Sequence, residues 1–282
     1  MHRVYNSAFM HMLRDEENGK YRSVLRETLA FDPGVLQRFV NFMTNPDEKQ
    51  AADQYGTQDK AFAVATLLST LPGLPMLGHG QVEGLRERYG HEFRRARVEE
   101  SSDTSHADHW ERRIVPLLRE RRLYAGTERF RLYDALADDG SVVEDVFAFT
   151  NGVGDDQRLV LVHNREATVV ARIDRSMDSE RLADALAIPA DGDVRLVDPR
   201  TGWETTRPAV ELRREGLRVT LGAYEAVVLR VAPPWQAPAA EPPVVAEPTA
   251  EPAATTPRKA KKSRPSKAPM PRTRRATEQP KA

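Results

Sequence analysis

The sequence predicts an α/β region, then an antiparallel β domain, then a disordered tail, and three observations support this order. Two short apolar strands, 39–43 and 74–77, each leave through a polar or glycine-rich exit, and an apolar helix joins them into a βαβ unit. From Arg129 onward the apolar pattern changes from helical spacing to short alternating runs. After Val231, twelve of the chain's 20 prolines gather among alanine, glutamate and basic residues.

The composition limits the classes of protein to which the chain can belong. Its 282 residues are 40% hydrophobic, enough for a real core, and the absence of cysteine excludes disulfides and thiolate metal sites. Net charge is zero, but residues 258–281 carry ten Lys or Arg and one Glu, so the tail is basic and the body acidic. The N-terminus shows no secretory signal pattern, and residues 72–75 interrupt the most apolar run, 61–77, so we expect no membrane span. The compartment stays open, with the cytoplasm slightly favoured.

The first strand, 39–43, ends by presenting a carboxylate. Thr44, Asn45 and Pro46 break the apolar run immediately before Asp47. Polar side chains at the carboxyl ends of strands lie where α/β folds keep their active sites. Asp47 is therefore the leading candidate for a functional residue. The alternative is that it only caps a short helix that begins at residue 48.

Helical patterns surround this strand. Residues 4–13 and 20–29 carry apolar side chains at helical spacing, and 48–55 predict a short polar helix. Residues 57–71 predict a helix that is apolar on nearly every side. Such a helix is expected to be buried between a sheet and other helices.

Two polar loops and a last helix follow the second strand. We expect 84–97 to be a solvated charged face in preference to a substrate or phosphate clamp, and 109–124 to be a helix with a kink at Pro116. Residues 101–108 predict a further polar loop. Four possible metal ligands lie near the junction of this loop and the helix: Asp103, His106, Asp108 and His109. Because no additional ligand converges with them, we interpret them as part of a solvated loop and predict no metal site.

Short strand patterns fill the region after Arg129. Eight runs are β-branched or alternating and are separated by turns. They are 130–133, 145–150, 157–164, 167–173, 194–198, 209–213, 217–221 and 226–231. Seven or eight short strands over about one hundred residues favour an antiparallel β-sandwich.

The two apolar strands and their exits resemble the seventh and eighth strands of the alpha-amylase superfamily barrel, glycoside hydrolase family thirteen. In that family a strand ending in Asn-His-Asp precedes an apolar helix and a Gly-x-Pro strand with a glycine-rich exit. Asn45 and Asp47 fall on the first motif. Four residues fall on the second: Gly73, Pro75, Gly80 and Gly84. The chain departs from the pattern at Pro46, which replaces His, at 78–79, where Gly-His replaces two tyrosines, and at Val82, where an acidic residue is expected.

The resemblance implies a particular domain organisation. Residues 1–125 would be the last units of a (β/α)8 barrel that is truncated on its N-terminal side, and 126–232 would be the β-sandwich that follows it. Residues 233–282 would form a disordered Pro/Ala-rich linker and basic tail. Strands one to five of the barrel are absent from the chain, so we expect the missing N-terminal part of the barrel to be a partner.

The resemblance also implies a function. The complete protein would be a retaining glycoside hydrolase or glucanotransferase that acts on α-glucans or oligosaccharides without a cofactor. Asp47 would be the third catalytic carboxylate, which binds sugar hydroxyls, while Asn45 and His79 would contact substrate; for His79, simple loop packing is an equal alternative. The nucleophile and the acid/base belong to the missing strands, and Glu48 is a poor substitute because adjacent side chains on a loop seldom converge on one bond. We therefore expect the chain to be inactive alone, and whether it is an enzyme is left open.

Two alternatives remain. The chain could be a non-catalytic carbohydrate-binding or protein-interaction module in which the β-sandwich is the working part. The basic arm, 258–275, could bind nucleic acid or an anionic membrane through charge. No aromatic residue lies within it to stack on bases, so a solubilising tail without a partner is favoured.

Overall fold

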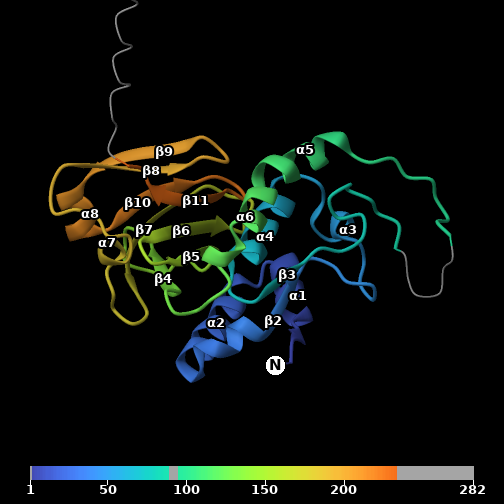
Figure 1. The fold of residues 1–282 in the computed structure, drawn as a ribbon, viewed down its shortest axis with the longest axis horizontal. Helices are drawn as coiled ribbons and strands as arrows, with labels where there is room; N and C mark the ends of the chain where they lie inside the picture. The colour runs from blue at the N-terminus through green and yellow to red at the C-terminus, as the bar shows by residue number, and fades with distance from the viewer. Residues whose placement is uncertain (1, 89–94, 234–282) are drawn as a thin grey trace, which may run out of the picture. The chain divides into compact units, whose positions relative to one another are not determined.

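A computed structural model describes residues 2–88 and 95–233 of the chain (Figure 1). The predictions for the linker and basic tail therefore lie outside the described residues, apart from residue 233. The described strands form two sheets. One is a three-stranded parallel sheet, and the other is an eight-stranded antiparallel sheet.

The parallel sheet has the order β1-β2-β3 and consists of β1 (Val4–Tyr5), β2 (Phe39–Phe42) and β3 (Leu74–Met76). Val40 pairs with Leu74 and Phe42 with Met76, so the predicted side-by-side strands are confirmed. Strand β1 corrects the expectation of a helix over 4–13. Residues 4 and 5 pair in parallel with β2, and the helix starts only at Ser7.

Helices connect and cover these strands. In chain order they are α1 (Ser7–Arg14), α2 (Asn18–Phe31), the 3-10 helix η1 (Pro33–Arg38), α3 (Ala51–Tyr55) and α4 (Asp59–Thr70). The expectation of a buried apolar helix is confirmed by α4, in which every residue from Ala61 to Thr70 is buried. Asn6 begins α1 by accepting a hydrogen bond from the backbone N–H of Phe9 at 3.3 Å.

The last helical segment differs from the prediction of one kinked helix over 109–124. It consists of α5 (Thr104–Arg113), α6 (Val115–Arg119) and the 3-10 helix η2 (Arg121–Leu123). The first helix starts earlier because Asp103 caps it, accepting from the backbone N–H of His106 at 3.0 Å. It ends before Pro116, whose backbone nitrogen has no hydrogen to donate to the carbonyl four residues earlier, as a continuous helix requires.

The antiparallel sheet has the order β10-β7-β4-β5-β6-β11-β8-β9. Its strands are β4 (Arg131–Leu136), β5 (Val146–Val153), β6 (Asp156–His163), β7 (Val169–Ser176), β8 (Asp193–Asp198), β9 (Trp203–Pro208), β10 (Leu217–Leu221) and β11 (Ala226–Val231). Strand β11 pairs with β6 through its first four residues and with β8 through its last two. The antiparallel β domain is thus confirmed, but its strands are joined into one continuous curled sheet where two separate sheets were expected.

Two short helices belong to this domain, α7 (Leu182–Ala185) and α8 (Ala209–Glu215). The prediction of a strand over 209–213 is therefore wrong. Ala209 and Leu212 are buried three residues apart, which is helical spacing, whereas Val210 is 57% exposed. The strand lies just before this helix, in β9, which the sequence patterns missed.

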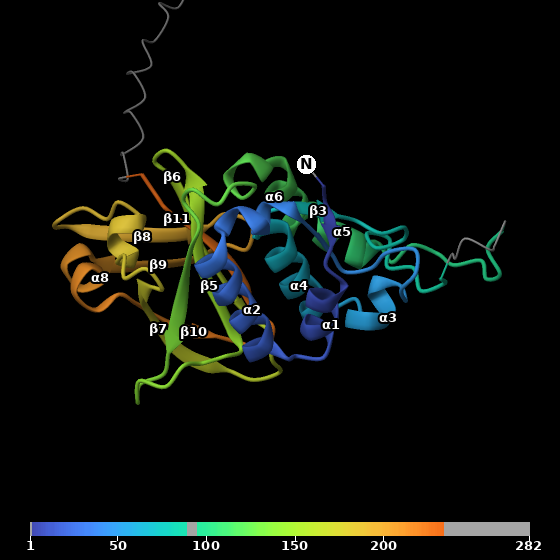
Figure 2. The ribbon, with the colours of Figure 1, turned by 90° about the horizontal axis from the view of Figure 1, so that it is seen from below.

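Both faces of the central strands β5 and β6 are buried, which explains their nearly continuous apolar runs, whereas β8 and β10 alternate buried and exposed residues. In β5, Phe147 and Phe149 join the core under the helices, whereas Val146 and Ala148 join the core inside the curl. Figure 2 shows α2 and α4 beside the strands of this sheet. The ring of Tyr21 in α2 lies 5.5 Å from that of Phe147, so helices and sheet share one core.

Polar contacts also fasten the helices to the sheet. Arg22, fully buried on α2, donates to Glu144 at 2.8 Å, to the carbonyl of Val146 at 2.7 Å and to Asp134. Each of these partners belongs to β4, β5 or the segment between them. A buried guanidinium with three acceptors is satisfied, and it fixes where α2 lies on the sheet.

Candidate functional site

A pocket lies where β2 and β3 end, and we call it the strand-end pocket. It encloses about 230 Å³. Its lining residues come from β1, the exits of both longer strands and the loop after β3: Tyr5, Thr44, Asn45, Pro46, Glu48, Gln50, Met76, Leu77, Gly78, His79 and Arg88. The pocket therefore sits at the carboxyl edge of the parallel sheet, where an α/β fold places its ligands.

Local hydrogen bonds shape the exit of β2. The side-chain oxygen of Asn45 accepts from the backbone N–H of Asp47 at 2.9 Å, which makes an Asx-turn through Pro46. The hydroxyl of Thr44 donates to the carbonyl of Lys49 at 2.7 Å and closes the loop. These bonds use the residue types that the sequence placed there, so the turn is encoded locally.

The exit of β3 requires a glycine. A Cβ at Gly78 would lie well inside 3.0 Å of the Cγ2 atom of Thr44, which is closer than real Cβ contacts come. The backbone N–H of Gly78 also donates to the side chain of Gln81 at 3.1 Å. The two exits can approach this closely only because residue 78 has no side chain.

The structure brings two of the three predicted site residues together. Asn45 and His79 both line the strand-end pocket, one just after β2 and the other just after its neighbour β3. Asp47 is exposed and is not among the lining residues; its backbone carbonyl accepts a hydrogen bond from Arg88. The role of the Asp47 carboxylate stays a prediction. The carboxylate that lines the pocket is that of Glu48, which lies 3.3 Å from the imidazole of His11.

Sequence reasoning missed several residues of the pocket. Tyr5 reaches it because β1 pairs beside β2, and a two-residue strand carries too little pattern to be recognised. Arg88 was assigned to a solvated face, yet it reaches back to the exit of β2. Gln50 is buried and donates to the carbonyl of Glu87 at 3.0 Å. These contacts join segments that are distant in the sequence, so no local pattern predicts them.

The interpretation of His106 as part of a solvated loop is wrong. The side chain is buried, and its Nδ1 lies 3.2 Å from the carbonyl of Thr57 while the indole N–H of Trp110 donates to its Nε2 at 3.0 Å. A neutral imidazole that donates from Nδ1 and accepts at Nε2 satisfies both bonds. Its Nε2 also lies 3.1 Å from the carbonyl of Gln81. In that tautomer Nε2 has no hydrogen to donate to Gln81, so His106 joins α5 to the loop before α4 through its bond to Thr57.

The described residues form neither a group of metal ligands nor a membrane-crossing helix. Between residues 2 and 88 and between 95 and 233, no group of three or more His, Asp or Glu side chains is placed to hold a metal ion. Within the same residues, no helix combines the length and the apolar character that crossing a bilayer requires.

The strand-end pocket has the chemistry of a polar binding site. Amide, imidazole, carboxylate and guanidinium groups surround it, and Tyr5 and Met76 supply apolar surface. Such groups can exchange hydrogen bonds with ligand hydroxyls. Within the described residues the pocket contains one lining carboxylate, whereas glycoside hydrolysis uses a pair of carboxylates on the two sides of the bond.

The elements define a class of fold: parallel strands with a pocket at their carboxyl edge, apolar helices behind them, and an antiparallel β domain packed on those helices. Solved structures of alpha-amylases are similar to this chain. A noncanonic maltogenic alpha-amylase from Thermotoga neapolitana matches with a TM-score of 0.55 at 13% identity. An alpha-amylase from Geobacillus thermoleovorans, complexed with acarbose, matches with 0.52 at 16%. An Anoxybacillus alpha-amylase matches with 0.51 at 14%.

The matches cover most of this chain but only part of each amylase chain. They cover 81%, 76% and 77% of this chain but 50%, 43% and 43% of the three amylase chains, so the chain spans half of their length or less. No family model matches the sequence, and no curated protein matches it. At these identities the likeness is one of fold. The amylase resemblance of the sequence is thus confirmed as a partial barrel and β domain of the amylase type.

Proposed function

We propose that this chain is the closing part of an α-glucan-acting enzyme of the alpha-amylase type, either a hydrolase or a glucanotransferase. Residues 1–125 would supply the last barrel units, 126–232 the β domain, and 233–282 a linker and basic tail. One observation carries the proposal: β2 and β3 lie side by side in parallel, and their exits form a polar pocket. The amylase fold of the neighbours supports the same reading.

The proposed roles of Asn45 and His79 follow from their positions in the pocket, and that of Asp47 follows from the amylase resemblance. Asn45 and His79 would hydrogen-bond sugar hydroxyls, and Asp47 would act as the third carboxylate, which holds and distorts the reacting sugar. The Asx-turn of Asn45 holds the backbone on which Asp47 stands. Two structural neighbours lend support: the Geobacillus alpha-amylase is complexed with acarbose, and AmyP is in complex with maltose.

The proposal assigns the bond-breaking carboxylates to strands outside these 282 residues. A retaining mechanism needs a nucleophile and an acid/base on opposite sides of the glycosidic bond. An incomplete barrel also leaves the edges of its outer parallel strands without hydrogen-bond partners. In this chain Val4 and Tyr5 on β1 are 50% and 64% exposed, and Leu74 on β3 is 45% exposed. The remaining barrel strands would cover this surface and complete the site.

The test is a hydrolysis assay on the protein expressed from the reading frame extended upstream of residue 1. Release of reducing ends from maltoheptaose would be compared for the parent, Asp47→Asn and Asp53→Asn. The matched control, Asp53, is a nearby exposed carboxylate on α3 that pairs with Arg86 at 3.2 Å and does not line the pocket.

We expect Asp47→Asn to lower kcat by about a hundred- to a thousandfold, the order seen when one hydrogen-bonding group that stabilises a transition state is removed. Asp53→Asn should stay within about twofold, the range of a surface substitution without a mechanism. Equal rates in the two variants would refute the role of Asp47. An extended protein that cleaves no α-glucan and transfers no glucosyl unit would refute the enzyme itself and favour the non-catalytic module.

A further inference from the structure

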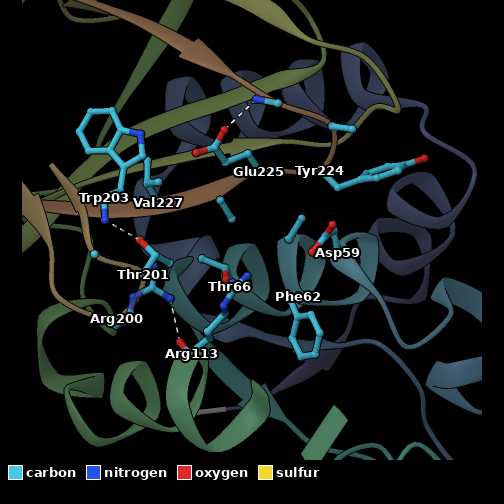
Figure 3. A pocket seen from close by; sticks show the side chains of 15 residues that line it. Asp59, Phe62, Thr66, Arg113, Arg200, Thr201, Trp203, Tyr224, Glu225 and Val227 are labelled. Atoms are coloured by element: carbon cyan, nitrogen blue, oxygen red, sulfur yellow. Dashed lines mark hydrogen bonds between the residues drawn. The ribbon is translucent and has the colours of Figure 1, made fainter. Parts of the chain in front are cut away.

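A second cavity lies between α4 and the β domain, and we call it the interface cavity (Figure 3). It encloses about 420 Å³, more than the strand-end pocket, and it shares no lining residue with that pocket. Helix α4 forms one wall, and the opposite wall comes from the turn after β8 and the start of β11. Its size falls within the roughly 300–1,000 Å³ typical of small-ligand sites.

Three aromatic side chains line the interface cavity. Trp203 is half-buried and packs with its inner side on the core of the curled sheet. Tyr224 is held in place because its phenol donates to Glu16 at 2.7 Å and the ammonium of Lys60 lies 5.6 Å from its ring centre. Phe62 is buried in the wall formed by α4. Tyr224 and Phe62 are therefore fixed before any ligand arrives.

Polar groups stand between these rings. One carboxylate oxygen of Glu225 accepts from the backbone N–H of Gly222 at 2.7 Å, which orients the group, and the described residues show no partner for the other oxygen. Asp59, the first residue of α4, is exposed at the cavity. Thr66 supplies a hydroxyl from the buried part of the same helix. Figure 3 shows Trp203 and Glu225 on one side of the cavity, with Asp59 and Thr66 on the other.

The charges at the cavity are nearly balanced. Arg200 is already engaged, because it donates to Asp198 at 2.7 Å and to the carbonyl of Arg113 at 2.7 Å. Its positive charge is thereby neutralised by a buried carboxylate. What remains is the guanidinium of Arg113 with the carboxylates of Asp59 and Glu225. A strongly charged ligand of either sign would meet a group of its own sign, whereas a neutral ligand would not.

We propose that the interface cavity is a second saccharide-binding site that takes one or two sugar units of a neutral oligosaccharide. A sugar ring has apolar C–H faces, which pack on aromatic side chains, and hydroxyls around its edge, which exchange hydrogen bonds with carboxylate, guanidinium and hydroxyl groups. Trp203 and Tyr224 supply the first kind of contact, and Glu225, Asp59 and Arg113 supply the second. That the saccharide is an α-linked glucan rests on the proposed function. That the ligand is a saccharide rests on the residues that line the interface cavity.

The test follows the indole N–H signal of Trp203 by NMR in the 282-residue chain. Trp203→Phe identifies that signal by its loss, and the buried Trp110, 1% exposed, provides an internal reference. Maltoheptaose is titrated against the parent and against Asn45→Ala, with inorganic phosphate as an anionic probe. Calorimetry then compares Trp203→Ala and Glu225→Gln with Phe31→Ala, an aromatic control that is 85% exposed and lines no described cavity.

Maltoheptaose should shift the Trp203 signal saturably, in the parent and in Asn45→Ala alike, and leave Trp110 unmoved. Trp203→Ala should weaken binding by at least about tenfold, and Phe31→Ala should not change it. A Trp203 signal that ignores maltoheptaose, or that moves with phosphate instead, overturns this site, while the hydrolysis assay still decides the strand-end pocket. A shift of Trp203 together with an extended protein that cleaves nothing leaves the site standing and refutes the proposed function.

Discussion

Replacing Gly78 with alanine tests whether the two strand exits really meet as described. A Cβ at this position would fall far inside the contact distance to Cγ2 of Thr44. Reaching the ordinary separation of about 3.5 Å would require the two methyl groups to move apart by about 1 Å. Thr44 has little room to yield, because it is 2% exposed and its hydroxyl is bonded to the carbonyl of Lys49 at 2.7 Å.

The expected cost follows from these contacts. Overpacking a tight site costs about 1–3 kcal/mol, and rotating Thr44 away would lose a hydrogen bond worth about 1 kcal/mol. We therefore predict that Gly78→Ala lowers the free energy of unfolding by about 2–4 kcal/mol. Equilibrium urea unfolding, followed by circular dichroism, measures this difference.

The matched control is Gly19→Ala in α2, where a Cβ would meet its nearest neighbour, Glu144, at an ordinary 3.5 Å. Alanine is the better helix former, so this variant should be neutral or more stable by up to about 1 kcal/mol. An unfolding midpoint of Gly78→Ala equal to that of the parent would show that the exits of β2 and β3 are not packed as described, and the reasoning about the strand-end pocket would fail with it.

Two further predictions concern the contacts between helices and sheet. Arg22→Met should lower the free energy of unfolding by about 2 kcal/mol, because the buried carbonyl of Val146 loses its hydrogen-bond donor. The carboxylates that pair with Arg22 add little to this cost, because they are partly exposed and can turn to water. A urea midpoint within error of the parent would contradict this prediction. Burial raises the pKa of Glu16, but hydrogen bonds from Lys60 and Tyr224 outweigh it, so the pKa lies below its ordinary 4.5. A depressed carboxyl pKa stabilises the fold above that ordinary value and less as pH falls through the folded value. The free energy of unfolding should therefore decrease as the pH falls below 4.5, and it should decrease less steeply in Glu16→Gln. Urea midpoints measured between about pH 6 and about pH 3.5 show this difference. Equal dependence of the midpoint on pH in the two proteins would exclude the role of Glu16.

The parts of the fold that carry local signals could be predicted. The apolar run of β2 ends at Asn45 and Pro46, and β3 lies between a Pro/Gly turn and Gly78, so both strands and the polar edge between them were visible in the sequence. The helix α4 was visible because ten consecutive residues are fit for burial. The site followed from these elements as far as Asn45 and His79, which the structure places in one pocket.

The remaining features depend on contacts between distant segments. His106 looked like a loop residue, but Thr57 and Trp110 take up both ring nitrogens in the folded chain. The interface cavity has no sequence signal either, because Phe62 and Trp203 come from elements more than a hundred residues apart. Charged and aromatic residues with such separations come together only when the β domain packs on α4.

We propose above all that the chain closes a barrel whose reactive carboxylates lie elsewhere. The most direct measurement is the release of reducing ends from soluble starch by the purified 282-residue chain alone, beside the extended protein at the same concentration. The account predicts no release above buffer by the chain and steady release by the extended protein. Turnover by the chain alone that disappears in Glu48→Gln would contradict it, because the strand-end pocket would then contain a complete catalytic site.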